Sequence, residues 1–161
     1  MSEEYELEVL LGLRREERQE AERRYAEALG AYHEAGRRVE EARQSVREKE
    51  EERRQRCQRF DQEVSAGPAR LADLRGFERF LEGLKEAEAA ARSALEEAGE
   101  RETRARAAMR EAHEGMIATI RALEAVEQHR LSWEEERRGE ERRKQSVAED
   151  EIAARIWRES P

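Results

Sequence analysis

The side chains best suited to catalysis or metal binding are few in this chain and lie far apart. The three histidines are His33, His113 and His129, and none belongs to a HExxH motif or to a Cys/His cluster. The single cysteine, Cys57, has no histidine near it in sequence. We therefore interpret the histidines as surface residues, expect no metal site, and favour a structural role for Cys57 over a reactive thiol.

The sequence motifs of nucleotide-binding and hydrolytic enzymes are absent as well. The chain has no glycine-rich phosphate loop, no Walker pattern and no nucleophile elbow. Acidic pairs such as Glu16-Glu17 lie in runs of alternating charge, which are typical of the solvated face of a long helix. We predict that the protein is not an enzyme and needs neither a cofactor nor a small-molecule substrate.

The composition favours long helices over a globular core. Of the 161 residues, 45% are charged and 37% are hydrophobic, and only two are proline. The formal net charge is -8 and no basic patch stands out, so we expect no nucleic-acid partner. The acidic start and the lack of a stretch of ~20 apolar residues predict neither a signal peptide nor a membrane span. A lone cysteine fits a reducing cytoplasm.

The strongest structural signal is a heptad spacing of small and apolar residues. In the N-terminal half they follow one another in steps of four and three, at Ala21, Tyr25, Ala28, Tyr32, Ala35, Val39, Ala42 and Val46. The C-terminal half repeats the spacing at Leu74, Phe77, Leu81, Leu84, Glu88, Ala91, Leu95, Ala98, Glu102, Ala105, Met109, Ala112, Met116, Thr119, Leu123 and Val126. The polar members are tolerable interruptions of a long seam. This regularity favours a coiled coil over the disorder that low hydrophobicity would otherwise allow.

One strong helix breaker, Gly67-Pro68, separates the two heptad segments, and Pro68 suits the first turn of a new helix. We predict an all-α fold in which two long helices form an antiparallel coiled-coil hairpin within a single domain, 1–161. Helix one would run over about 3–64 with Ser2 as its N-cap, the turn would cover about 65–68, and helix two would run over about 69–158.

A turn centred near Gly67 brings the most hydrophobic segments of the two helices together. Leu7, Leu10 and Leu13 would face Val126, Leu123 and Ile120, and Phe60 and Val64 would face Leu74 and Leu71. Beyond about Gln128, helix two would have no partner and would overhang by roughly 45 Å at the helical rise per residue.

Two sets of apolar residues are candidates for binding other proteins. Phe80, Leu84, Ala87 and Ala91 form a second stripe that shares Leu84 and Ala91 with the seam, so the apolar face is wider than a two-helix seam requires. The alternative is that Phe80 merely covers the seam. The overhang carries the second set, Leu131, Trp133, Val147, Ile152, Ile156 and Trp157. These residues would bind another chain; the alternatives are that they bind a second copy or that this end of the helix frays.

Three segments give the chain a resemblance to the FliJ/YscO family of type III export, in which YscO is also called SctO. The first is the opening from Tyr5 to Arg14, and the second is Gly-Phe-Glu-Arg-Phe-Leu-Glu-Gly-Leu at 76–84. The third is Arg-Arg-Lys-Gln at 142–145 followed by Asp-Glu-Ile-Ala at 150–153. Ala91 is smaller than the residue that some family members carry at that place.

The resemblance implies a stalk-like coupling protein of a flagellar or injectisome system. Its partners would be the secretion ATPase hexamer, the cytoplasmic domain of the export gate and, in some members, escort chaperones. The gate contact would fall on Phe80, Leu84, Ala87 and Ala91, and we assign the ATPase ring contact to Trp133, Ile152, Ile156 and Trp157. The protein would be cytoplasmic and peripheral at the inner-membrane export apparatus.

Two other functions stay open at this stage. One is a stalk subunit of a rotary ATPase, although such chains are usually longer or carry a globular insertion. The other is a plain structural coiled-coil adaptor.

Overall fold

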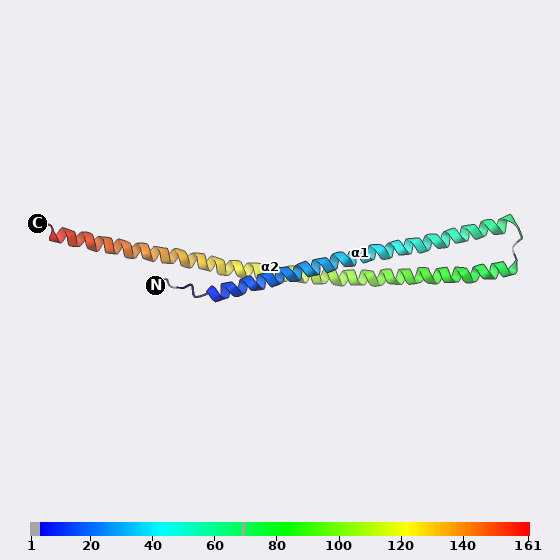
Figure 1. Ribbon diagram of the computed structural model, residues 1–161, viewed down its shortest axis with the longest axis horizontal. Helices are drawn as coiled ribbons and strands as arrows, with labels where there is room; N and C mark the ends of the chain where they lie inside the picture. Colours follow the sequence, from blue (N-terminus) through cyan, green and yellow to red (C-terminus); the bar gives the residue numbers. More distant parts are fainter. Residues whose placement is uncertain (1–3, 69) are drawn as a thin grey trace. The chain divides into compact units, whose positions relative to one another are not determined.

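The computed structural model describes residues 4–68 and 70–161, and in this part of the chain every regular element is an α-helix. Helix α1 is Glu8–Ala66, with 59 residues, and helix α2 is Leu71–Glu159, with 89 residues (Figure 1). The two helices pack against each other, which confirms the predicted all-α hairpin. No helix in the described ranges has a stretch long and apolar enough to cross a membrane.

The chain divides into two compact units, and both helices contribute to each. Unit 1 contains the residues up to Arg23 and those from His113 onward, and unit 2 contains Arg24–Ala112 with the turn between the helices. The segments within each unit are antiparallel. In unit 2, for example, Phe60 of α1 contacts Phe77 of α2, whereas Arg53, which is earlier in α1, contacts Glu88, which is later in α2.

The predicted heptad positions form the seam between the helices. All eight positions from Ala21 to Val46 are buried or half-buried, and so is every position from Phe77 to Val126. Only Leu74, in the first turn of α2, is exposed. Because many of these positions are alanine, each removes little apolar surface from water, and the few larger side chains supply most of the hydrophobic stabilisation.

Helix α1 begins at Glu8 rather than at about residue 3. Glu4 to Leu7 are not helical, and the Glu8 N–H donates to the carbonyl of Tyr5 at 3.0 Å. Tyr5 itself is buried. Burial of an aromatic ring outweighs the hydrogen bonds of one more exposed helical turn, which explains the later start. The predicted cap Ser2 lies outside the described residues.

The connection between the helices also comes later than predicted. Helix α1 continues through Ala66, and Pro68 precedes α2 instead of starting it. The Arg70 N–H donates to the Asp73 carboxylate at 3.3 Å. This is the return bond of a capping box, and it marks Arg70 as the residue that caps a helix beginning at Leu71.

The later connection moves the pairing of the helices along α2. Phe60 stacks on Phe77, with 3.8 Å between ring centroids, rather than facing Leu74. Val64 and Leu71, predicted to face each other, are both exposed. The predicted register is therefore corrected by about one helical turn.

The core of unit 1 also differs from prediction, because a different side of α1 faces α2 there. Its buried members are Tyr5, Leu11, Leu123 and Val126, with Leu7, Leu10 and Trp133 packed against them. Leu13, predicted to face Ile120, is 48% exposed, whereas Leu11 is fully buried. Extending the four-and-three spacing back from Ala21 through Arg18 and Arg14 reaches Leu11, so the signal for this position was present in the sequence.

Candidate partner-binding surfaces

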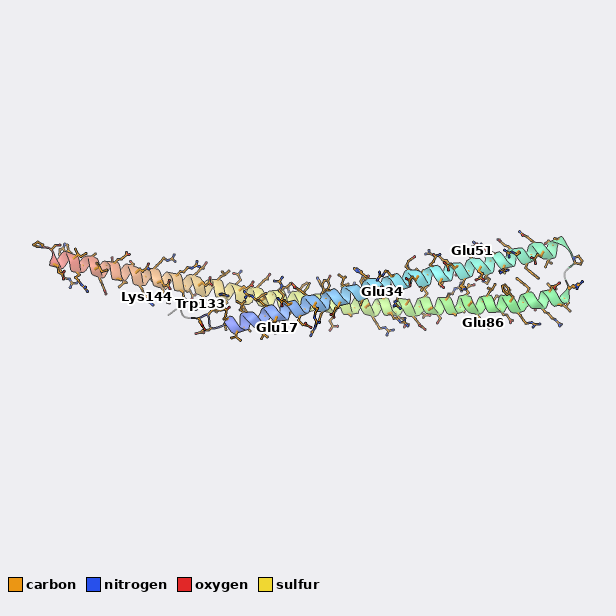
Figure 2. All side chains as sticks on the ribbon, in the orientation of Figure 1. Glu17, Glu34, Glu51, Glu86, Trp133 and Lys144 are labelled. Atoms are coloured by element: carbon orange, nitrogen blue, oxygen red, sulfur yellow. The ribbon has the colours of Figure 1, made fainter. Side chains whose placement is uncertain are left out.

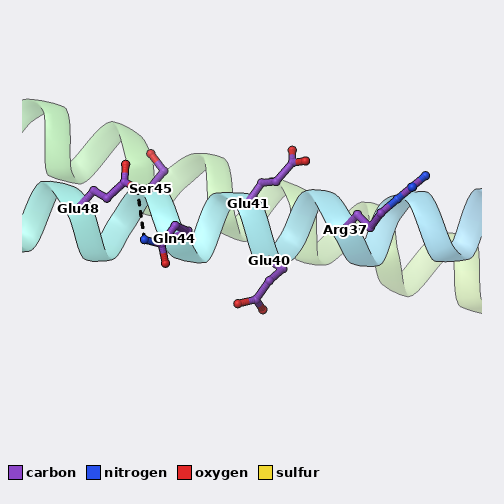
Figure 3. A pocket seen from close by; sticks show the side chains of 6 residues that line it. All are labelled: Arg37, Glu40, Glu41, Gln44, Ser45 and Glu48. Atoms are coloured by element: carbon purple, nitrogen blue, oxygen red, sulfur yellow. Dashed lines mark hydrogen bonds between the residues drawn. The ribbon is translucent and has the colours of Figure 1, made fainter.

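The hollows on the helix surfaces do not form enclosed sites. One runs along α1 and is lined by Arg37, Glu40, Glu41, Gln44, Ser45 and Glu48. In Figure 3, Glu40 and Glu41 point to opposite sides of the helix, and the Gln44 amide donates to Glu48 at 3.2 Å. Because these side chains come from successive turns of one helix and face water, they offer no shielded volume in which chemistry could occur.

The histidines and the cysteine lie apart in the structure, as they do in the sequence. The Tyr5 hydroxyl lies 2.7 Å from Nδ1 of His129, and the His33 ring lies 6.0 Å from that of Tyr32. Cys57 is half-buried in unit 2. Within residues 4–68 and 70–161, no group of three or more His, Cys, Asp or Glu residues is placed to hold a metal ion.

The four residues predicted to contact an export gate do not share one exposed face. Leu84 is buried in the seam, and Ala87 and Ala91 are half-buried. Phe80 alone is substantially open, at 44% exposed. The guanidinium of Arg56 from α1 lies 5.4 Å from the centre of the Phe80 ring, which leaves the aromatic edge available beside a cation.

Other apolar side chains accompany Phe80 near the turn, and the sequence interpretation had assigned them to the seam. Val64, Leu71 and Leu74 are all exposed in unit 2. The predicted pairing of the helices placed them in the seam, but they lie at the helix ends next to the connection, where the opposite helix offers too little surface to cover them. The end of unit 2 next to the connection therefore exposes more apolar side chains than the spacing of residues in the sequence predicted.

The four residues predicted to contact an ATPase ring fall into two classes. Trp133 was expected to lie in an unpaired overhang, but its ring packs against Tyr5, with 5.3 Å between centroids, and the Arg137 guanidinium lies 5.0 Å from it. Pairing therefore extends past Gln128, because Tyr5 lies beside this part of α2. Ile152, Ile156 and Trp157 are 57%, 61% and 81% exposed.

The last part of α2 is unpaired from about Glu140 onward. From Glu140 to Ala153 every residue is exposed, including Val147. Figure 2 shows Lys144 on the stretch of α2 that continues beyond the start of α1 in unit 1. Between Trp133 and this stretch, Arg137–Glu141 and Arg138–Glu134 form ion pairs one turn apart on the helix. Partly exposed pairs of this kind are individually weak and exchange readily.

One polar residue that interrupts the seam in unit 2, Glu88, belongs to a layer of ion pairs between the helices. Glu88 is only 5% exposed, and its carboxylate accepts from Arg53 Nε at 2.6 Å and lies 2.7 Å from Arg92 Nη2. Arg92 also donates to Glu50 of α1 at 2.8 Å. The hydrogen bond from Arg53 and the positive charges of Arg53 and Arg92 lower the pKa of Glu88 below its ordinary value of 4.5, against the opposing effect of burial.

This depressed pKa predicts a specific loss of stability in acid. Since the folded pKa lies below 4.5, Glu88 stabilises the fold above that pH and loses this contribution as pH falls through the folded value. Thermal unfolding of the wild type and of Glu88→Gln, followed from pH 7 to pH 3, should show a gap in melting temperature that narrows in acid. Glu97→Gln, at an exposed pair on the same helix, is the matched control. A gap that is constant with pH would contradict the assignment.

A comparison with protein families gives one match, and it spans nearly the whole chain. The model of the family described as YscO-like protein matches residues 2–159. No curated protein and no solved structure matches the chain significantly. Because the match includes both helices and the turn, it applies to both units.

Proposed function

Because this chain belongs to the YscO-like family, which relates it to type III secretion, we propose that it is a non-enzymatic coupling protein of a type III export apparatus. It would link the secretion ATPase to the cytoplasmic domain of the export gate, at the inner-membrane export apparatus. The observation that carries the proposal is the family match over residues 2–159. A coupling role needs two separate contacts, and each unit has exposed apolar side chains that could make one of them.

The gate contact is proposed at the turn end of unit 2. Phe80 is the exposed aromatic residue there, and Leu71 and Leu74 are exposed closer to the connection, on other sides of α2. Aromatic side chains often dominate the energy of protein interfaces, since they bury a large area with few rotatable bonds. Leu84, Ala87 and Ala91 would support this surface from the seam rather than touch the partner directly.

The ATPase contact is proposed on the unpaired end of α2. Ile152, Ile156 and Trp157 supply apolar anchors, and Val147 lies about one turn before them. A helix inside a ring meets several similar subunits in turn. The partly exposed Arg/Glu pairs that precede the anchors suit this role, because weak ion pairs can exchange partners at small cost.

Binding measurements with the two isolated partners test the proposal. The full chain should bind both the secretion ATPase and the cytoplasmic domain of the export gate in calorimetric titrations. If it binds only one of them, the coupling role is excluded. If it binds neither, a structural adaptor of the apparatus is the better description.

Replacing Phe80 with alanine is expected to weaken gate binding about tenfold or more, as loss of an aromatic anchor usually does. The helicity of the chain should stay unchanged, since the ring is outside the seam. Leu131→Ala, which removes a 52% exposed leucine from unit 1, is the matched control and should bind normally. Wild-type affinity of Phe80→Ala would remove this surface from the proposal. Leu84→Ala is unsuitable here because loss of a buried leucine destabilises the seam itself.

A further inference from the structure

We propose that the layer of Glu50, Arg53, Glu88 and Arg92 is a register lock, which determines which turn of α1 pairs with which turn of α2 in unit 2. The layer crosses the seam between the Phe60–Phe77 stack and the alanine-rich remainder of the unit. The inference concerns how the hairpin is held in one alignment, and it does not depend on the partners proposed above.

The seam beside the layer repeats itself and therefore specifies its alignment only weakly. Its alanines recur every seven residues, at Ala28, Ala35 and Ala42 in α1 and at Ala91, Ala98, Ala105 and Ala112 in α2. A slide of one heptad, about 10 Å along the helix, brings alanine against alanine again. The larger α1 residues Tyr25, Tyr32, Val39 and Val46 have the same seven-residue spacing, so their apolar contacts would also be replaced by similar ones.

The ionic layer does not tolerate such a slide. Arg53 occupies the heptad position of Val46 and Phe60, and Glu88 occupies that of its apolar neighbours one heptad away. After a slide of seven residues in either direction, Glu88 would face Val46 or Phe60 instead of Arg53. Its carboxylate, now 5% exposed, would then lose its hydrogen bond from α1 and would keep only Arg92 of its own helix as a partner. Removing one partner of a buried charge is strongly unfavourable, whereas exchanged apolar contacts are nearly equivalent.

Arg92 makes the layer more selective than a single pair. It lies on the same helix as Glu88, one turn further on, and it bridges from Glu88 to Glu50 of α1. The native alignment thus satisfies two connections between the helices at once. Because the rest of the seam repeats, a second alignment lies one heptad away. Disrupting this one layer should make that second alignment accessible.

Disulfide trapping in the full chain tests the lock, with Cys57→Ser as the background to remove the native thiol. Ala35, Ala98 and Ala105 line one groove between the helices, so these positions report the native alignment. Ala35→Cys is combined in turn with a cysteine at Ala98, Ala105, Ala91 or Ala112. With the lock intact, mild oxidation should give disulfides with positions 98 or 105 and only background with positions 91 and 112.

Replacing the pair by leucines, in Arg53→Leu with Glu88→Leu, should turn a disulfide with position 91 or 112 from background into a major product. The control is Glu100→Leu with Arg104→Leu, which removes an exposed pair from the same unit and should keep the native pattern. If the leucine variant loses helicity by circular dichroism, the corresponding alanine pair, which matches the surrounding seam, replaces it. A native pattern in the folded, lock-free variant would overturn the proposal and assign the register to the turn and the aromatic stack.

Reversing all four charges of the layer gives a second, independent test. The reversed layer restores the same two connections with opposite polarity, so disulfides should again be confined to positions 98 and 105. If this variant formed disulfides with position 91 or 112 in the same yield as the leucine variant, charge pairing would not be what holds the alignment.

Discussion

Replacing Leu11 with alanine is expected to lower the free energy of unfolding of unit 1 by about 2–5 kcal/mol, the usual cost of deleting a fully buried leucine side chain. Leu11 is fully buried in a core with Tyr5, Leu123 and Val126. Few other large apolar side chains are buried in this unit, so little remains to compensate for the cavity. The effect should be the largest of any single apolar substitution in α1.

Fluorescence of Trp133 during denaturant unfolding measures this effect, because its ring packs on Tyr5 in the same core. Trp157 is 81% exposed and is replaced by phenylalanine in every protein compared, so that Trp133 is the sole reporter. Leu13→Ala is the matched control: it removes the same side chain two residues away, where it is 48% exposed. It should cost less than about 1 kcal/mol. Equal losses for the two variants would contradict the assignment of Leu11 to the buried face of α1.

Ending the chain at Gly139 is expected to abolish stimulation of the secretion ATPase while leaving both helical pairings intact. This truncation keeps Trp133 and Arg137, which belong to the packed part of unit 1, and removes the exposed anchors Ile152, Ile156 and Trp157. An earlier end, before Trp133, would also remove the ring that covers Tyr5 and would confuse loss of binding with loss of folding.

ATPase turnover at matched protein concentrations and low salt measures the effect. A full-length chain with serine at Ile152, Ile156 and Trp157 separates the contribution of the apolar anchors from that of helix length, and it should stimulate as poorly as the truncated chain. Equal stimulation by the truncated and wild-type chains would move the ring contact elsewhere. No stimulation by the wild type would favour a structural adaptor.

Much of the fold follows from local spacing. The steps of four and three residues from Ala21 to Val46 identified the buried face of α1, and all eight positions are covered in the structure. Heptad periodicity determines the azimuth of each side chain around its helix, and this property needs no knowledge of the partner. The same spacing, continued backward, contained Leu11, so its burial was predictable as well.

The sites were less predictable, because exposure depends on where the opposite helix begins and ends. Phe80 was correctly placed beside the seam, but Leu84 and Ala91 serve the seam itself, and Leu71 and Leu74 are exposed only because the helices end near them. Likewise, the greater length of α2 predicted that its last part is exposed, but the start of this exposed part was predicted too early in the helix. Trp133 is packed because the chain before α1 lies beside it.

The sequence by itself determined that two long helices pair through a heptad seam around one breaker, because periodicity and a Gly-Pro break are local properties. Only the tertiary structure decided the alignment of the helices along their axes. A seam that repeats alanine every seven residues has nearly equivalent alignments, so the choice among them depends on contacts between residues far apart in the chain. Arg53–Glu88, Phe60–Phe77 and Tyr5–Trp133 are such contacts, and no pattern within either helix specifies them.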